Sequence, residues 1–246
     1  MAGGGLLGLC TAWYLRRRGL SVTVFDAGRA GGAASWAGGG ILWPIYPWRY
    51  PLQVQNLALA GAARYPALCK ALYAAPGIDC ELRRCGALVL DEGEREAALA
   101  WAATRGWDAV VQDAAVLTAI APGLRARQAV ALPQVTQLRN PRLCRALVQA
   151  LRRDGVAVRE HCAVHGLRLS AGRIQELDTE QGPALARRVV IAAGAWSDQL
   201  APAGVVPRVR PVRGQMLLLR GRPGLLPGIV IRAGRYLIPR ADGRIL

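Results

Sequence analysis

The sequence contains very little lysine, histidine or phenylalanine. Among its 246 residues one is lysine, two are histidine and one is phenylalanine, so arginine carries nearly all of the net charge of +16. The arginines are spread along the whole chain, whereas nucleic-acid-binding proteins concentrate basic residues on one face or one helix. The charge therefore does not indicate a nucleic-acid partner, and we expect none.

Membrane-spanning and secretory segments are also missing. No apolar run is long enough to cross a bilayer. The apolar stretch Leu6–Leu15 is followed by the basic cluster Arg16–Arg18, whereas a signal peptide carries its charge first. We therefore expect a soluble, cytoplasmic protein with no membrane partner.

Metal-binding and disulfide patterns are absent as well. The six cysteines include no Cys-x-x-Cys pair, and a chain of this size does not need disulfides, which predicts reduced thiols. The run Glu160–His165 holds two histidines and one cysteine, but a zinc site would need a fourth ligand and a reason for the tight spacing, so a polar strand is favoured and we expect no metal.

The first eight residues contain a glycine pattern typical of dinucleotide-binding proteins. Gly3, Gly5 and Gly8 form a G-x-G-x-x-G pattern. In such a turn one glycine permits the tight bend, one lets a pyrophosphate approach the backbone and one lets the helix pack closely. Only Met1 and Ala2 precede the turn, so the strand that normally leads into it is missing.

The residues after the turn continue the pattern. Residues 6–18 predict a helix that ends at Gly19, and residues 21–26 predict a strand that ends in Asp26. Asp26 lies 21 positions after Gly5. At this spacing a carboxylate meets the ribose of a dinucleotide bound at the helix N-terminus.

Two further stretches suit a backbone close to a ligand. Residues 27–42 are rich in glycine and alanine, yet Trp36 and Ile41 make them too apolar for a linker, so close approach to a flat ligand is favoured. Residues 187–197 predict a buried strand that ends in small residues. A ligand contact at that end and an ordinary strand-to-helix turn both stay open.

The rest of the chain alternates helices and strands. The helices are predicted at 52–73, with Leu57, Leu59, Leu68 and Leu72 in the core, and at 91–105, 116–124 and 142–153. The strands are predicted at 80–84, 86–90, 129–132, 156–159, 164–169 and 173–177, and from residue 208 onward. Asp242-Gly243 predicts a hairpin turn.

Five groups of motifs, in this order, resemble the D-amino-acid oxidase superfamily of FAD-dependent enzymes, and within it the glycine oxidases of thiamine biosynthesis. They are residues 3–8, 34–42 with 46–51, 139–143, 190–197, and 211–216 with 236–240. A lone glycine pattern is weak evidence, whereas five groups in the family's order are specific.

The resemblance implies an α/β fold in which a Rossmann-like FAD-binding domain, lacking its first strand, is interleaved with an α+β substrate domain built on an antiparallel sheet. The FAD-binding domain would comprise residues 1–78 and 138–205, and the substrate domain residues 79–137 and 206–246. The family continues for roughly a hundred further residues, which carry the arginine that binds the substrate carboxylate. In this chain Arg213, Arg232 and Arg240 are the candidates to replace that arginine.

The resemblance also implies site residues. The flavin pyrophosphate would lie over Gly3, Gly5 and Gly8, with Asp26 on the adenosine ribose and the backbone of Val164 at the adenine. The phosphates and the flavin would be lined by Arg29, Ser35, Ala37, Gly38 and Gly39, with Ala193 and Gly194 closing over the cofactor. Ile41 and Leu42 would lie by the reacting face of the ring, and Tyr236 would help to hold the substrate carboxylate.

The implied reaction is oxidative deamination of a small, glycine-like amino acid by FAD and oxygen, giving an oxo acid, ammonia and hydrogen peroxide for thiamine thiazole synthesis. Because the flavin takes the hydride, no acid–base pair is required, and the sequence shows no such constellation. Two alternatives stay open. One is an inactive remnant that binds no flavin, and the other is a D-amino-acid dehydrogenase or sarcosine oxidase relative. The oligomeric state is also open, a homo-oligomer included.

Overall fold

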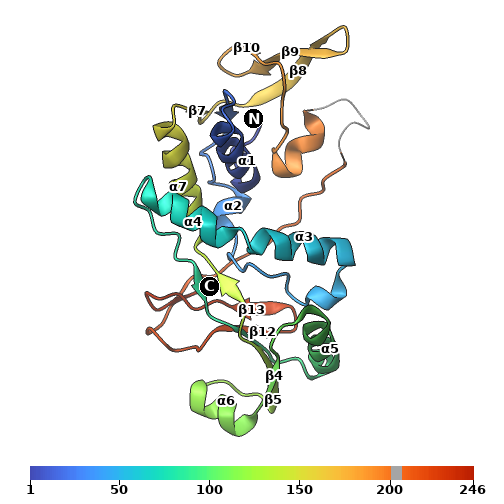
Figure 1. Cartoon of the computed structure of the whole chain (residues 1–246), viewed down its shortest axis with the longest axis vertical. Helices are drawn as coiled ribbons and strands as arrows, with labels where there is room; N and C mark the ends of the chain where they lie inside the picture. The colour runs from blue at the N-terminus through green and yellow to red at the C-terminus, as the bar shows by residue number, and fades with distance from the viewer. Residues whose placement is uncertain (201–206) are drawn as a thin grey trace. The chain divides into compact units, whose positions relative to one another are not determined.

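The computed structural model describes residues 1–200 and 207–246, and the chain divides into two compact units (Figure 1). Unit 1 comprises Met1–Gly38, Cys69–Cys80 and Asn140–Gly214, and unit 2 comprises Gly39–Leu68, Glu81–Arg139 and Gln215–Leu246. Each unit is thus assembled from three separate segments. Compactness groups residues 39–68 with unit 2, whereas the sequence-based assignment keeps them in the FAD-binding domain.

Three helices form most of the helical layer of unit 1. They are α1 (Leu6–Arg17), α2 (Ala34–Ala37) and α7 (Asn140–Arg153), and both α1 and α2 pack against α7. Leucines 143, 147 and 151 of α7 are fully buried. They recur every fourth residue, so they lie on one face of the helix. The apolar periodicity that predicts this helix is therefore also what attaches α1 and α2.

The sheet around the glycine turn is parallel. Strand β1 (Thr23–Phe25) pairs with β7 (Ala157–Arg159), and Ala2 forms parallel bridges to Phe25 on one side and to Ile191 on the other. The amide of Ala2 donates to the Val190 carbonyl at 2.9 Å. Ala2 therefore lies between Phe25 and Ile191 as an isolated parallel bridge, directly before the glycine turn.

The buried strand predicted within residues 187–197 is wrong. In this stretch only Ile191 forms a bridge, Val190 is 38% exposed, and a 3₁₀-helix, η3 (Gly194–Gln199), follows. The β-branched composition favours a strand, but a ladder needs a paired neighbour along its length. Here the neighbour at the bridge is the single residue Ala2.

The remaining strands of unit 1 form an antiparallel sheet in the order β10–β9–β8. They are β8 (Val164–Ser170), β9 (Arg173–Thr179) and β10 (Ala184–Leu185). The predicted pairing of 164–169 with 173–177 is confirmed.

The central sheet of unit 2 has five strands in the order β13–β12–β3–β5–β4. They are β13 (Arg235–Leu237), β12 (Ile229–Arg232), β3 (Ala87–Val89), β5 (Gln128–Leu132) and β4 (Val110–Asp113). All neighbours are antiparallel except β12 and β3. The antiparallel sheet is thus confirmed apart from one pair. The sequence did not predict β4, whose valines are exposed at the sheet edge.

Shorter elements complete unit 2. Two two-stranded sheets pair β2 (Arg83–Arg84) with β6 (Thr136–Gln137) and β11 (Leu219–Arg220) with β14 (Arg244–Ile245). The helices are η1 (Pro47–Arg49), α3 (Leu52–Ala62), η2 (Glu92–Glu94), α5 (Arg95–Arg105) and α6 (Ala114–Ile120). The predicted Asp242-Gly243 hairpin is confirmed by paired hydrogen bonds between Ile238 and Leu246.

The helix predicted over residues 52–73 is two helices, α3 and α4 (Tyr65–Ala74). Pro66 explains the break, because proline has no amide to donate to the preceding turn. The predicted core residue Leu57 is 78% exposed, so that expectation is wrong, whereas Leu68 and Leu72 are buried.

The core of unit 2 is aromatic. Trp101 packs edge-on against Trp107 and Trp43, with ring centroids 5.1 Å and 6.2 Å away. Its indole N–H donates to the Gln55 side-chain oxygen at 2.8 Å, so the polar end of the buried ring is satisfied. These contacts anchor the chain that follows the glycine-rich segment 39–42.

Candidate cofactor-binding and active site

The glycine turn of unit 1 is packed too tightly for side chains at two of its positions. Gly3 has a φ of +107°, and a Cβ atom there would lie 2.3 Å from the Ala192 carbonyl oxygen. A Cβ atom on Gly8 would lie 2.0 Å from the Gly3 carbonyl oxygen. Real Cβ atoms do not approach a backbone oxygen so closely, so both glycines are required to bring helix α1 against the turn.

Gly5 differs from these two glycines. Within 4 Å, a Cβ atom on Gly5 would meet only the Ser35 hydroxyl, at 3.2 Å. Gly5 is also the N-cap of α1, with no side-chain cap hydrogen bond. The backbone is therefore open at the positive end of the helix dipole, where an anion is stabilised. These residues fit the pyrophosphate of a dinucleotide.

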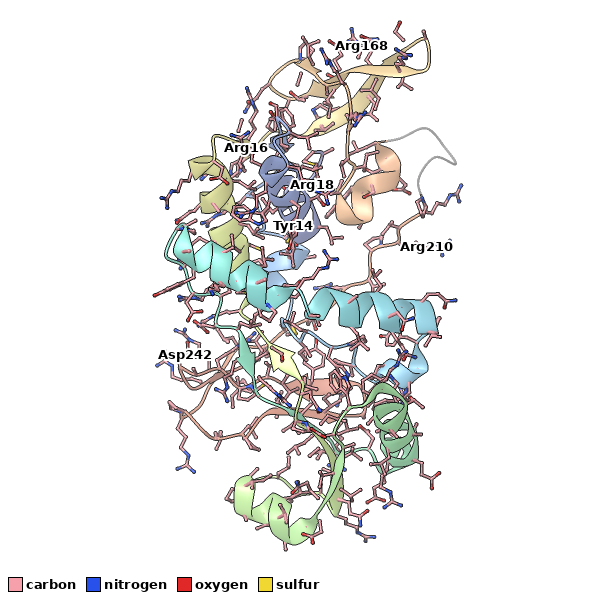
Figure 2. The ribbon with its side chains drawn as sticks, in the orientation of Figure 1. Tyr14, Arg16, Arg18, Arg168, Arg210 and Asp242 are labelled. Atoms are coloured by element: carbon pink, nitrogen blue, oxygen red, sulfur yellow. The ribbon has the colours of Figure 1, made fainter. Side chains whose placement is uncertain are left out.

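The positive partial charge at the N-terminal end of α1 comes from the backbone amides. The basic residues of the helix lie at its other end, where Arg16 and Arg18 stand in and just after the last turn (both labelled in Figure 2). Ser35 of α2 lies beside the start of α1, where its hydroxyl accepts a hydrogen bond from the Leu6 amide at 2.8 Å. A predicted cofactor residue thus also satisfies one of the free amides of the first turn.

Asp26 joins the end of β1 to the glycine turn. Its carboxylate accepts the Gly4 amide at 2.8 Å through one oxygen and the Gly28 amide at 2.9 Å through the other. Each carboxylate oxygen has a second lone pair, so Asp26 retains the capacity to accept a ribose hydroxyl. The bonds to the glycine backbone are a role that the spacing argument does not predict.

The segment before β8 runs beside Asp26. The amides of His161 and Cys162 donate to the carbonyls of Gly28 and Asp26 at 2.9 Å and 2.8 Å. This pairing places Val164, the first residue of β8, two residues beyond the contact. Of the other predicted residues of unit 1, Ala193 borders Gly3, because its amide nitrogen would lie 2.8 Å from a Cβ there.

Arg29 and Ala37 are exposed, and Gly194, with a φ of +59°, begins η3. Glu160 orders the backbone next to Arg29. It accepts the Ala30 amide at 2.9 Å and the Arg152 guanidinium at 2.7 Å. Burial acts to raise the pKa of Glu160, but these two bonds and the positive charges of Arg152 and Arg29 lower it overall.

Asn140 has a role that the sequence did not reveal. Its side-chain amide donates to the Ser35 carbonyl at 3.2 Å. The same amide nitrogen would lie 2.4 Å from a Cβ on Gly38. Asn140 therefore holds α2 in place. Its side chain also leaves no room for a Cβ at Gly38, the residue that follows α2.

In unit 2, the predicted flavin-lining and substrate residues meet at Gly39. A Cβ atom on Gly39 would lie 2.6 Å from the Ile238 side chain, 3.1 Å from the Met216 methyl group and 3.5 Å from the Tyr236 ring. The Tyr236 hydroxyl donates to the Met216 sulfur at 3.6 Å. Met216 is a neighbour of Tyr236 that the sequence analysis did not include among the site residues.

The residues after Gly39 pair with β6. Ile41 forms an antiparallel bridge to Gln137, and the Leu42 amide donates to the Thr136 carbonyl at 2.9 Å. The Leu138 amide returns a bond to the Gly40 carbonyl at 2.9 Å. Ile41 and Leu42 are both half-buried, so each is partly accessible.

The candidate carboxylate-binding arginines occupy unequal environments. Arg213 and Arg232 are exposed, whereas Arg240 is buried and donates to the Gly39 and Leu138 carbonyls and to the Gln137 side chain. Burial and the like charge of Arg139 lower the pKa of Arg240. The protein engages both terminal nitrogens of Arg240, one of them twice, so Arg240 cannot offer a carboxylate the end-on pair of these two nitrogens.

Within residues 1–200 and 207–246, no three histidine, cysteine, aspartate or glutamate side chains are grouped as a metal ion requires. In the same residues, no helix is both long enough and apolar enough to cross a membrane.

Comparison with known proteins assigns the family. The sequence profile of the family described as FAD dependent oxidoreductase (DAO) matches residues 2–246. The chain belongs to this family. It is 41% identical to glycine oxidase of Pseudomonas putida over 252 residues, which cover 100% of this chain and 68% of that protein. Glycine oxidase of Pseudomonas aeruginosa is 40% identical over 252 residues, covering 100% of this chain and 69% of that protein.

A solved structure agrees with these relatives. The crystal structure of glycine oxidase from Geobacillus kaustophilus superposes with a TM-score of 0.90 at 29% identity, over 99% of this chain and 68% of that chain. The fold of the chain is therefore that of the DAO-family enzymes. The cofactor of this family is FAD, and the enzyme class of the chain is FAD-dependent amino-acid oxidase.

Proposed function

We propose that this DAO-family chain oxidises glycine or a similarly small amino acid. The substrate, oxygen and water give an oxo acid, ammonia and hydrogen peroxide; for glycine the oxo acid is glyoxylate. FAD, when bound, accepts the hydride from the carbon that carries the amine. The residues of the chain then have to bind the cofactor, orient that carbon and exclude water.

The observation that carries the proposal is the meeting of Gly39 with Tyr236 in unit 2. Gly39 belongs to the motif expected at the flavin, and Tyr236 to the motif expected at the substrate carboxylate. The ring of Tyr236 lies 3.5 Å from where a Cβ on Gly39 would be. This contact supports a reaction centre beside Gly39, with Tyr236 holding the substrate.

The proposal of a small substrate is supported by the relatives named glycine oxidase, at 41% and 40% identity. Ile238 and Met216 fill the space beside Gly39, at 2.6 Å and 3.1 Å from where its Cβ would be. The Tyr236 hydroxyl donates only to a thioether, which is a weak acceptor, so a carboxylate would readily replace that partner.

In unit 1 we assign the pyrophosphate to Gly3, Gly5 and Gly8 and the ribose to Asp26. Val164 is assigned to the adenine, and Arg29, Ser35, Ala37, Gly38, Ala193 and Gly194 to the rest of the cofactor. The open face of Gly5 supports the pyrophosphate assignment, and the free lone pairs of Asp26 support the ribose assignment. The family resemblance also suggests that the product serves thiamine thiazole synthesis in the cytoplasm, where the six free cysteines would stay reduced.

The proposal is tested by supplying the purified chain with FAD, oxygen and single amines. Glycine is expected to give peroxide and glyoxylate, measured by a peroxidase-coupled assay and by derivatising the oxo acid. Tyr236→Phe should raise the KM for glycine about tenfold, because one hydrogen bond to a charged group is lost.

Other outcomes identify the alternatives. Flavin reduction without peroxide formation indicates a dehydrogenase. Formaldehyde from sarcosine, faster than glyoxylate from glycine, indicates a sarcosine oxidase relative. A folded chain that takes up no FAD indicates the inactive remnant.

A further inference from the structure

Unit 2 contains a buried cation whose role is not explained by the predicted site. The Arg240 side chain is only 6% exposed. One terminal nitrogen donates to the Gln137 side-chain oxygen at 2.6 Å and to the Leu138 carbonyl at 2.9 Å, and the other donates to the Gly39 carbonyl at 2.8 Å. All three acceptors are neutral.

The carboxylates near Arg240 form ion pairs with another arginine. Glu81 and Asp242 influence Arg240, but Arg139 forms ion pairs with them at 3.2 Å and 3.1 Å. The Nε atom of Arg240 is buried without a hydrogen-bond partner. Burying a cation against neutral groups costs free energy, so its presence here indicates a role for the hydrogen bonds that it donates.

What Arg240 fixes is the start of the flavin-lining segment. Its guanidinium bridges the Gly39 carbonyl to Leu138 and Gln137, the chain with which residues 40–42 pair. Gln137 is itself 2% exposed and donates to the Pro239 carbonyl at 2.8 Å. Gly39 has no side chain of its own, so its position depends on such partners.

We propose that Arg240 is a positioning residue for the cofactor. Through the Gly39 carbonyl and Gln137 it holds the backbone of residues 39–42 in the conformation that receives the flavin ring. The inference rests on the proposed function, because the contact of this segment with FAD is taken from there. A purely structural brace would affect the stability of unit 2 and leave the affinity of the folded protein for FAD unchanged.

The test compares Arg240→Gln and Arg240→Lys with a matched control, Arg235→Gln. Arg235 is an exposed arginine on β13, so its replacement removes the same charge from the same part of the chain. The first measurement is hydrogen exchange of the Leu42 and Leu138 amides without FAD. The second is the Kd of FAD from quenching of flavin fluorescence, at a temperature where every variant is folded.

We expect Arg240→Gln to exchange both amides about tenfold faster and to raise the Kd of FAD about tenfold. Arg240→Lys should restore part of both effects, because a lysine can still donate to the Gly39 carbonyl. Arg235→Gln should match the wild type.

Unchanged exchange in Arg240→Gln would overturn the proposal. Faster exchange with an unchanged Kd would also overturn it, since Arg240 would then be a brace without effect on the cofactor. If Arg240→Gln does not fold, Arg240→Lys is judged by the same two measurements. If the wild-type chain binds no FAD, the proposed function fails, and unit 2 keeps only the backbone role that the exchange data show.

Discussion

Two glycine-rich segments of the chain, one in each unit, are held in different ways. The turn at residues 3–8 of unit 1 depends on the absence of side chains, because at two of its glycines a Cβ atom would collide with a backbone oxygen. The segment 39–42 of unit 2 is shaped by side chains from elsewhere, chiefly Arg240 and Gln137. Adding a methyl group to the turn should therefore destabilise unit 1, and removing a polar side chain that supports residues 39–42 should destabilise unit 2.

Gly8→Ala should have the largest effect. The new methyl group would stand 2.0 Å from the Gly3 carbonyl oxygen, so helix α1 must move away from the turn. We expect a loss of at least about 3 kcal/mol in the free energy of unfolding, measured by urea denaturation. Gly5→Ala is the matched control, because its methyl group meets only the Ser35 hydroxyl. Equal destabilisation by the two variants would contradict the packing account.

Gln137→Leu tests the opposite dependence in unit 2. The change leaves Arg240 without one acceptor and the Pro239 carbonyl without its donor, both in a buried site. We expect a loss of about 2–4 kcal/mol in the free energy of unfolding, for one neutral and one charged hydrogen bond. Gln53→Leu is the surface control, since Gln53 is exposed on α3 of the same unit. Similar losses for both variants would show that the buried hydrogen bonds of Gln137 contribute no more to the free energy of unfolding than a surface glutamine does.

Ser35→Ala should have a smaller effect on unit 1. It removes the acceptor of the Leu6 amide at the start of α1. We expect a loss of about 1 kcal/mol, typical of a helix-capping hydroxyl, measured as the shift of the urea midpoint at constant m-value. Ser35→Thr keeps the hydroxyl and should retain most of the stability. A Thr variant as unstable as the Ala variant would argue against the capping role.

The smallest effect is a dependence on pH. The pKa of Glu160 is lowered in the folded protein, so its carboxylate contributes stability above the ordinary pKa of glutamate. That contribution is lost as the pH falls through the lowered value. In Glu160→Gln this part of the acid-side decline in stability should be absent, as followed by thermal unfolding between about pH 3 and 7. An unchanged decline would exclude the contribution of Glu160.

The sequence predicted the two segments unequally well. The helix and the strand that follow the glycine turn, α1 and β1, were predicted because their residues are close in sequence and their spacing encodes the geometry. Asn140, Gln137, Met216 and Arg240 were not identified as supports, because they act on residues about 100 to 200 positions away. The local sequence signal for such a role is an arginine placed directly after the apolar run Leu237-Ile238-Pro239.

Local composition also misled in two places. Residues 187–193 have the composition of a buried strand but form only one bridge, because pairing depends on a neighbouring strand. Leu57 has helical spacing with buried leucines, yet lies on the exposed side of α3. Periodicity predicts that a helix exists better than it predicts what covers each of its faces.

The most direct test of the account is a titration of the wild-type chain and Gly5→Ala with FAD, followed by flavin fluorescence. The open backbone at Gly5 predicts saturable binding by the wild type, and binding at least about tenfold weaker by Gly5→Ala at nearly equal stability. Binding of FAD with the same Kd by both proteins, or no binding by the folded wild type, would contradict the claim that the glycine turn holds the cofactor.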